Sequence, residues 1–257
     1  MHIKDFVNNT DWSNGMDAIK IENLTKRYKD VVAVDNLNLS IKKGELFSLL
    51  GVNGAGKTTT IKMLSCLTKP TSGDAWLNGK SIRHETSEVK SMIAVSPQET
   101  AVAPGLSVKE NLDLMCGIYG LDQDKKNAKI AELTKLLGLE TVISKKAGKL
   151  SGGWQRRLSI AMALVGEPEI LFLDEPTLGL DVLARSDLWE LIRLLKGKIT
   201  IILTTHYMEE AEALSDRIAI MKDGNLLICD TVAKIKEIAG TDSFEQAFIH
   251  IVKGAVK

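Results

Sequence analysis

The sequence has 257 residues, 44% hydrophobic and 26% charged, which predicts one α/β domain with a sizeable core. Lysine plus arginine total 33, as do aspartate plus glutamate, so no overall cationic field favours nucleic acid as a partner. No apolar run approaches the ~20 residues that span a bilayer, and the N-terminus lacks the features of a signal peptide. We therefore expect a cytoplasmic protein that reaches a membrane only through a partner.

The N-terminal part of the chain is expected to be rich in β-structure. Residues 1–15 are polar and aperiodic and are predicted to form a flexible extension, with Met16 as an alternative translation start. A single domain is expected over residues 16–257. Apolar residues alternate along 18–24 and again from Leu37 to Ile41, which is typical of strands.

A glycine-rich loop follows the short apolar run 46–50, which is predicted to be a buried strand. The loop matches G-x-x-x-x-G-K-[ST] at each fixed position, and 61–64 continue it as a helix whose N-terminus attracts anions. Its backbone N–H groups can approach phosphate oxygens, Lys57 can reach the β- and γ-phosphates, and the Thr58 hydroxyl can hold Mg²⁺. The nucleotide-binding residues predicted here are Gly51, Asn53, Gly54, Ala55, Gly56, Lys57, Thr58 and Thr59.

The middle of the chain is predicted to form an α-helical subdomain inserted into the α/β core. Ser107 and Glu110 have the spacing of a capping box, which opens a helix to about Tyr119. Before it we expect a turn at 70–73 and strands at 74–77 and 92–95. After it we expect a second helix at about 124–137. The insert covers about residues 100–150, and the α/β core about 16–98 and 151–240.

Two carboxylates follow a predicted buried strand at 170–173. In a parallel sheet, ligands bind beyond the C-terminal ends of the strands, so Asp174 is expected beside the glycine-rich loop, where it can hold Mg²⁺. Glu175 is one residue further on and can orient or deprotonate an attacking water. The alternative is that both acids merely end the strand.

A second anion site is predicted at the helix that begins after Leu150. Ser151 is a suitable N-cap, and Gly152 and Gly153 leave backbone N–H groups accessible to a phosphate. A plain helix cap is the simpler alternative. Further along, we expect helices at about 182–195 and 209–214, strands at 199–203, 217–221 and 226–229, and C-terminal helices at about 231–253 against the sheet edge.

Together these motifs identify the chain as similar to the nucleotide-binding subunits of ABC (ATP-binding cassette) transporters. The motifs cover about residues 18–230 in the family's order. The resemblance implies a P-loop NTPase (RecA-like) α/β fold that binds ATP and Mg²⁺ and hydrolyses ATP. It implies roles for six kinds of site. These are adenine stacking by Tyr28, binding of ATP and Mg²⁺ by the Q-loop residue Gln98, the signature Leu150–Gly153, the catalytic carboxylate Glu175, the D-loop residue Asp181 and the switch histidine His206, which would contact the γ-phosphate.

The family architecture also implies partners. Two subunits stack head to tail, so that each ATP lies between one Lys57 loop and the partner's Ser151, Gly152, Gly153 and Asp181. Both a homodimer and a heterodimer are compatible with this sequence. A separate integral membrane permease would hold the subunit at the inner face of the membrane, and no nucleic-acid partner is expected. The stretch 205–212 resembles the drug- and antibiotic-export branch.

One position departs from the family pattern, because Trp154 stands where the signature usually has glutamine. Gln155 follows it, and the serine and glycines are intact. Two other functions were weighed. A soluble ABC ATPase acting on nucleic acid or ribosomes usually has coiled-coil insertions or two cassettes per chain, and neither feature fits here. A regulatory cassette that does not turn over ATP disagrees with the presence of Glu175 and His206.

Overall fold

The computed structural model describes residues 17–254, so the predicted flexible extension at 1–15 lies outside the described residues. Within 17–254, no helix combines the length and the apolar character needed to cross a membrane.

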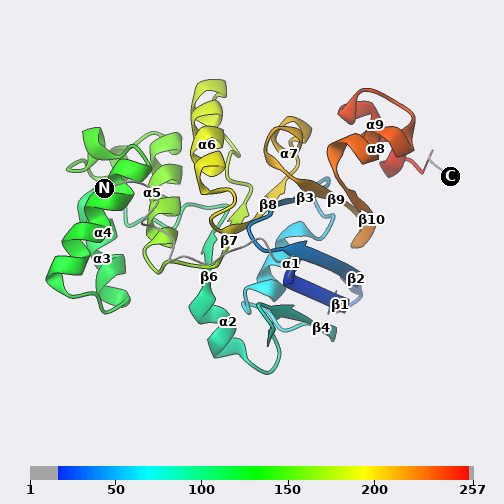
Figure 1. Ribbon diagram of the computed structural model, residues 1–257, viewed down its shortest axis with the longest axis horizontal. Coiled ribbons are helices and arrows are strands. Elements are labelled where there is room, and N and C mark those ends of the chain that lie inside the picture. Colours follow the sequence, from blue (N-terminus) through cyan, green and yellow to red (C-terminus); the bar gives the residue numbers. More distant parts are fainter. Residues whose placement is uncertain (1–16, 255–257) are drawn as a thin grey trace.

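The centre of the molecule is a six-stranded, mostly parallel sheet with the strand order β10-β9-β3-β8-β7-β6 (Figure 1). β3 pairs in parallel with β8 and β9, and β7 pairs in parallel with β8 and β6. β10 adds an antiparallel edge. The strands are β3 (Leu46–Leu50), β6 (Ile93–Ser96), β7 (Ile170–Asp174), β8 (Thr200–Thr205), β9 (Arg217–Lys222) and β10 (Asn225–Asp230).

A second, antiparallel sheet lies against one face of the first and has the order β2-β1-β4-β5. It consists of β1 (Asp17–Tyr28), β2 (Val31–Lys42), β4 (Ser72–Leu77) and β5 (Lys80–Ser81). Helix α1 (Lys57–Leu64) contacts both sheets, through β2 and β7. Successive residues of β3 belong to different cores, because successive side chains of a strand point to opposite faces of the sheet. Phe47 and Leu49 enter the core between the sheets, whereas Leu46 enters the core beneath the helices.

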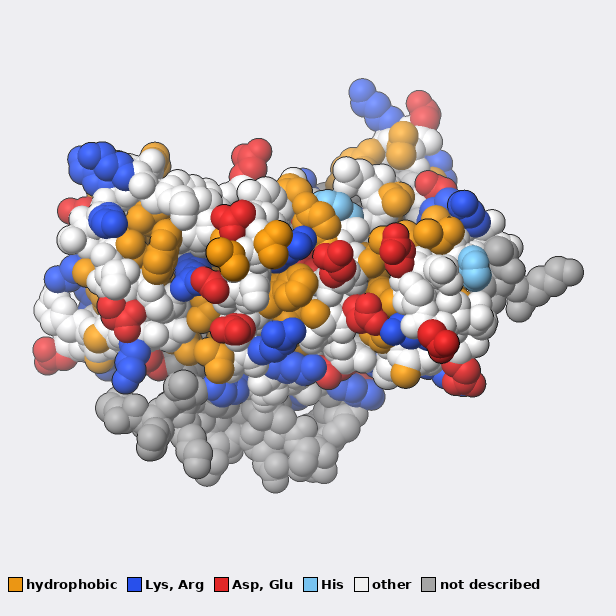
Figure 2. All heavy atoms as spheres, turned by 90° about the horizontal axis from the view of Figure 1, so that it is seen from above, with side chains coloured by type: hydrophobic (Ala, Val, Ile, Leu, Met, Phe, Trp, Pro, Cys, Tyr) orange, Lys and Arg blue, Asp and Glu red, His pale blue; other side chains and the backbone are white. Residues whose placement is uncertain are grey.

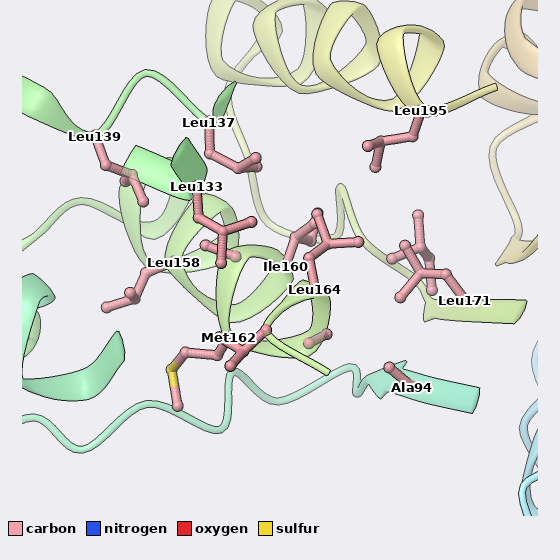
Figure 3. Close-up of a cluster of buried hydrophobic side chains, with 14 of the residues drawn as sticks. Ala94, Leu133, Leu137, Leu139, Leu158, Ile160, Met162, Leu164, Leu171 and Leu195 are labelled. Atoms are coloured by element: carbon pink, nitrogen blue, oxygen red, sulfur yellow. The ribbon is translucent and has the colours of Figure 1, made fainter. Parts of the chain in front are cut away.

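Helices lie on the other side of the parallel sheet, where α5 (Gly152–Leu164) packs against β6. On α5 pack α3 (Val108–Ile118) and α4 (Gln123–Leu136), which lie beyond the β6 edge of the sheet (Figure 1), and also α6 (Val182–Leu195). Figure 3 shows part of the core beneath the helices, and this core runs from Leu133 of α4 and Leu158 of α5 to Leu171 of β7. The predicted capping box is confirmed, since Ser107 and Glu110 accept each other's backbone N–H. Within the segment predicted as the helical insert, the structure forms the two helices α3 and α4.

The C-terminal helices pack on the antiparallel edge of the parallel sheet, as predicted. α8 (Val232–Ala239) and α9 (Phe244–Val252) contribute Ile235 and Phe244 to a small core with Ile218 and Ile220 of β9. The short helix α7 (Met208–Leu214) joins this core through Ala211.

Two local predictions were wrong. The expected turn at 70–73 is partly strand, because β4 already begins at Ser72. Gly73 has φ +74°, and a Cβ there would lie 2.1 Å from the Asn23 carbonyl oxygen, so glycine allows β4 to approach β1. The strand expected from Met92 begins one residue later, since Met92 ends helix α2 (Thr86–Met92). α2 buries only Val89, and its sequence carries little apolar periodicity.

Candidate active site

The glycine-rich loop joins β3 to α1. Gly56 is the N-cap of α1 with φ +102°, and a Cβ there would lie 2.5 Å from the Ala33 carbonyl oxygen. Only glycine therefore fits this close approach to β2. No side chain caps this end of α1, so its first N–H groups are available to an anion. The loop forms a concave backbone surface at the C-terminal edge of the sheet.

Lys57 is buried, with 5% of its surface exposed, and its ammonium lies under the loop. Its Nζ donates to the carbonyl oxygens of Gly51, at 2.6 Å, and Val52, at 3.3 Å. The same nitrogen lies 3.3 Å from a carboxylate oxygen of Glu175, which directly follows β7. One cation thus connects the loop to the acidic strand end, as the sheet topology predicted.

Asp174 lies between the loop and β8. Its Oδ1 accepts hydrogen bonds from the hydroxyls of Thr58, at 3.2 Å, and Thr204, at 2.5 Å. The first bond brings together two of the three residues, Thr58, Asp174 and Gln98, that the sequence predicted to hold Mg²⁺. The sequence motifs gave no role to Thr204, although it lies near the end of β8, two residues before His206.

Glu175 is the other acid at the end of β7, and its backbone is in the left-handed region with φ +49°. Non-glycine residues rarely adopt this conformation, and strain of this kind is often found at functional sites. Its N–H donates to the hydroxyl of Thr204, at 3.0 Å, and Oε2 lies 2.7 Å from Nδ1 of His206. The carboxylate is therefore held between Lys57 and His206.

These residues line a cavity of 270 Å³. It brings together most of the predicted nucleotide-binding residues and adds two that the sequence did not indicate, Ala33 and Leu178. The lining residues are Ala33, Asn53, Gly54, Ala55, Gly56, Lys57, Thr58, Thr59, Gln98, Glu175, Leu178 and His206. Polar and charged groups dominate this wall, which suits a polyphosphate better than an apolar ligand.

Tyr28 lies outside this lining. Its ring is 44% exposed at the end of β1, and the Lys26 ammonium lies 4.9 Å from the ring centroid. An exposed aromatic face with a neighbouring cation can stack on a planar ligand.

The predicted second anion site also lies outside the cavity, at the N-terminus of α5. Ser151 is exposed and is the N-cap, yet its side chain makes no capping hydrogen bond. The alternative that Ser151 serves only as a helix cap therefore does not account for its hydroxyl, which caps nothing in this chain. Trp154 is half-buried, with the Arg157 guanidinium 4.8 Å from its ring centroid. Asp181 caps α6 by accepting the N–H of Ala184, at 2.9 Å.

A buried carboxylate that sequence analysis missed lies behind the site. Glu210 of α7 is fully buried, and its Oε1 accepts a hydrogen bond from the indole N–H of Trp189, at 3.0 Å. Burial raises the pKa of Glu210, while the hydrogen bond from Trp189 opposes that shift. Glu210 follows the exposed Glu209 on the short helix α7, and nothing in the local sequence distinguishes the buried carboxylate from the exposed one.

Comparison with known proteins agrees with this geometry. The ABC transporter family model matches residues 34–178, and a model described as "AAA domain, putative AbiEii toxin, Type IV TA system" matches 146–211. The probable multidrug ABC transporter ATP-binding protein YbhF of Escherichia coli (strain K12) is 37% identical over 244 residues, which cover 93% of this chain. The Nod factor export ATP-binding protein I of Burkholderia orbicola (strain AU 1054) is 43% identical over 208 residues, covering 80% of this chain and 68% of the relative.

Solved structures give the same assignment. An ATP-binding subunit of an ABC transporter superposes with a TM-score of 0.80 at 27% identity, covering 91% of this chain and 99% of that one. The dimeric post-hydrolysis state of the ATP-binding cassette MJ0796, bound to ADP and Pi, has a TM-score of 0.75 at 30% identity, covering 83% and 98%. The chain belongs to the ABC transporter family and carries its ATP-binding ATPase cassette. It spans 42% of the length of YbhF.

Proposed function

We propose that this chain binds and hydrolyses ATP in the cavity beside Lys57 and thereby drives an ABC transporter, of the exporting kind, through ATP-dependent dimerisation. The observation that carries the proposal is the placement of Glu175. Its carboxylate lies 3.3 Å from the Lys57 ammonium and 2.7 Å from His206, at the wall of the loop-lined cavity. A base, a cation and a third polar group meet where a terminal phosphate would lie.

The loop supplies most of the binding energy for the nucleotide. Phosphate oxygens would accept hydrogen bonds from the N–H groups of Gly54–Thr59, and the ammonium of Lys57 would exchange Glu175 for the β- and γ-phosphates. Tyr28 is proposed to stack on adenine. Gln98, which lines the same cavity, is proposed to contact the γ-phosphate side of the site.

The residues present fit a magnesium ion. Within 17–254 no group of three histidine, cysteine, aspartate or glutamate residues could hold a metal. Asp174 and Thr58 are nevertheless hydrogen-bonded, and Mg²⁺ needs only one or two protein oxygens because phosphates and water complete its shell. Thr58, Asp174 and Gln98 would hold it, and it would neutralise charge on the phosphates.

Glu175 is proposed as the general base of hydrolysis. It would take a proton from water as the water oxygen bonds to the γ-phosphorus, while the bond from that phosphorus to the bridging oxygen breaks and ADP leaves. His206 would hold the carboxylate through its Nδ1 and present the rest of its ring to the γ-phosphate. Lys57 would stabilise the charge that develops on the transferred group.

The helix N-terminus at Ser151 supports the dimeric part of the proposal. Ser151, Gly152, Gly153 and Asp181 would complete the partner's ATP site, because within one chain they do not line the cavity. The post-hydrolysis dimer of MJ0796, to which this fold is similar, supports such a pairing. A membrane permease on a separate chain would receive the motion at the inner face of the membrane.

The names of the relatives favour export over a soluble role, since YbhF is named for multidrug transport and the Burkholderia protein for Nod factor export. On the face drawn in Figure 2, lysine and arginine side chains are interspersed with acidic ones and do not form one cationic band. That pattern does not favour a nucleic-acid partner on this face.

The proposal is tested by measuring phosphate release by the purified full chain with ATP and Mg²⁺, beside the Glu175→Gln variant. The proposal is supported if the wild type hydrolyses ATP, the variant does not, and both proteins bind ATP. Equal turnover in both proteins removes Glu175 from the reaction. Affinity capture of the tagged chain from its own membranes then asks whether an integral membrane protein accompanies it.

A further inference from the structure

An arginine that is almost fully buried connects α5 to the loop that carries Gln98. Arg156 is 3% exposed, and its two terminal nitrogens donate to the consecutive carbonyl oxygens of Pro97, at 2.6 Å, and Gln98, at 2.5 Å. The planar guanidinium matches two neighbouring acceptors in a way that a lysine ammonium does not. The sequence motifs assign no function to Arg156.

This arrangement is costly in the isolated chain. Buried arginines usually pair with a carboxylate, but among the described residues no ion pair within 4.0 Å involves Arg156, and its Nε has no hydrogen-bond partner. Burial lowers the pKa of Arg156, and the more distant charges of Asp174 and Glu210 oppose that shift. A neutral side chain at this position would avoid the cost of burying a charge. The presence of an arginine here therefore indicates that its two hydrogen bonds to the loop have a function.

The loop held by Arg156 has little regular structure of its own. Residues 97–103 follow β6 without forming a helix or strand. Pro97 lacks an N–H group and offers only its carbonyl oxygen for a backbone hydrogen bond. The loop is instead aligned along α5, because Ser96 hydrogen-bonds Ser159, at 3.0 Å, and the Thr100 hydroxyl reaches Gln155, at 3.5 Å. The two Arg156 bonds, to Pro97 and Gln98, are the shortest in this series.

The N-terminus of helix α5 lies close to Arg156. This end of the helix, at Ser151 and Gly152, is exposed, one helical turn before Arg156. Gln98, by contrast, lines the cavity of the same chain. The first turn of α5 therefore lies between two sites. Its N-terminus forms part of the site proposed for the partner's nucleotide, and Arg156 at its other end holds Gln98, which lines the chain's own cavity.

We propose that Arg156 is a positioning residue that fixes the Gln98 loop to α5, so that a displacement of the α5 N-terminus moves Gln98 in the chain's own site. The inference rests on the proposed function for the meaning of both sites. It adds that Arg156 acts through Gln98, and not as a ligand of ATP or of a metal.

The test combines Arg156→Met, which keeps much of the volume, with Arg156→Lys, which keeps the charge but cannot reach both carbonyl oxygens in one plane. Arg157→Met is the matched control, because Arg157 lies next in α5 and forms an ion pair with Asp187, at 2.8 Å, away from the loop. Hydrogen–deuterium exchange of residues 96–102 should rise at least threefold in both Arg156 variants and stay at the wild-type rate in the control.

The activity measurement is a double-mutant cycle with Gln98→Ala. Arg156→Met should lower kcat about tenfold with little change in the Kd for ATP, and Arg156→Lys should not rescue it. Adding Arg156→Met to Gln98→Ala should lower kcat no further, because the side chain being positioned is already absent. In the control cycle, the factors by which Arg157→Met and Gln98→Ala each change kcat should multiply in the double variant.

Two results would overturn the inference. One is unchanged exchange of residues 96–102 in both Arg156 variants, and the other is a multiplicative effect of Arg156→Met and Gln98→Ala on kcat. If Arg156→Met does not fold, Arg156→Lys answers both questions. A wild-type chain without ATPase activity would contradict the proposed function, whereas the exchange measurement would still decide whether Arg156 holds the loop.

Discussion

The ammonium of Lys57 lies 3.3 Å from a carboxylate oxygen of Glu175, and both side chains are more than nine-tenths buried. The glycine-rich loop and the acidic end of β7 are thus joined by a buried ion pair whose members come from distant parts of the sequence. Phosphates that bind in the loop would compete with Glu175 for this cation. Substrate binding would then release the carboxylate that we propose as the base.

Replacing Glu175 with Gln should lower the hydrolysis rate by ~10² or more, the usual scale for loss of a general base. ATP binding should survive, because the loop and Lys57 are intact. The variant should remain dimeric in the presence of ATP and Mg²⁺, which size-exclusion chromatography with light scattering would detect. A monomer under these conditions would argue against closure by bound ATP.

Lys57→Ala should abolish turnover and weaken ATP binding, since Lys57 is the one lysine or arginine among residues 17–254 that lines the cavity. It should also cost stability of about 1–3 kcal/mol, because the carbonyl oxygens of Gly51 and Val52 and the carboxylate of Glu175 lose a buried donor. Urea unfolding and fluorescent-nucleotide titration measure the two effects. Combining it with Glu175→Gln should restore part of the lost stability, and a purely additive loss would count against the ion pair.

The α5 N-terminus is tested best at Gly152. A Cβ there would meet only Leu180 Cδ2, at 3.4 Å, whereas one at Gly153 would lie 3.0 Å from the Ala184 Cβ. Gly152→Asp should keep or raise the melting temperature, because a carboxylate favours a helix N-terminus, yet it should prevent ATP-driven dimerisation by repelling phosphate.

Gly152→Asn is the neutral control for that variant and should dimerise far better than Gly152→Asp. Trp154 provides a second readout, since indole fluorescence responds to a change in exposure as the dimer closes, with Trp154→Phe as the blank. Normal turnover by Gly152→Asp would remove this helix end from the shared site.

The buried carboxylate of Glu210 predicts a pH effect on stability. Burial raises its pKa above the ordinary ~4.3, so the folded protein keeps a proton that the unfolded chain releases. This contribution is fully present below about pH 4.3 and is lost as the pH rises through the folded-state pKa. The Glu210→Gln variant cannot titrate here.

The unfolding free energy of wild type minus that of Glu210→Gln should therefore decrease from pH 4.5 to pH 8, as measured by urea unfolding. The control is Glu209→Gln, whose exposed carboxylate lies 3.7 Å from Arg185. A difference that stays constant with pH for Glu210→Gln would show that this carboxyl titrates alike in both states.

The sequence by itself determined the parts of this site that depend on local chemistry. The spacing of Gly51, Gly56 and Lys57 predicted the loop, and the apolar run before Asp174 predicted a buried strand that ends in acids. The capping box at Ser107 located the helical insert. Each signal lies within a few residues, because capping, turn geometry and strand burial are short-range effects.

Only the tertiary structure decided which of these parts meet. β8 lies between β3 and β7 in the sheet, so Thr204 and His206 at its end reach Asp174 and Glu175. No local sequence pattern predicts that strand order. The role of Arg156 was hidden for the same reason, since an arginine beside Arg157 on a helix looks like a solvated charge until the packing of α5 buries it against the Gln98 loop.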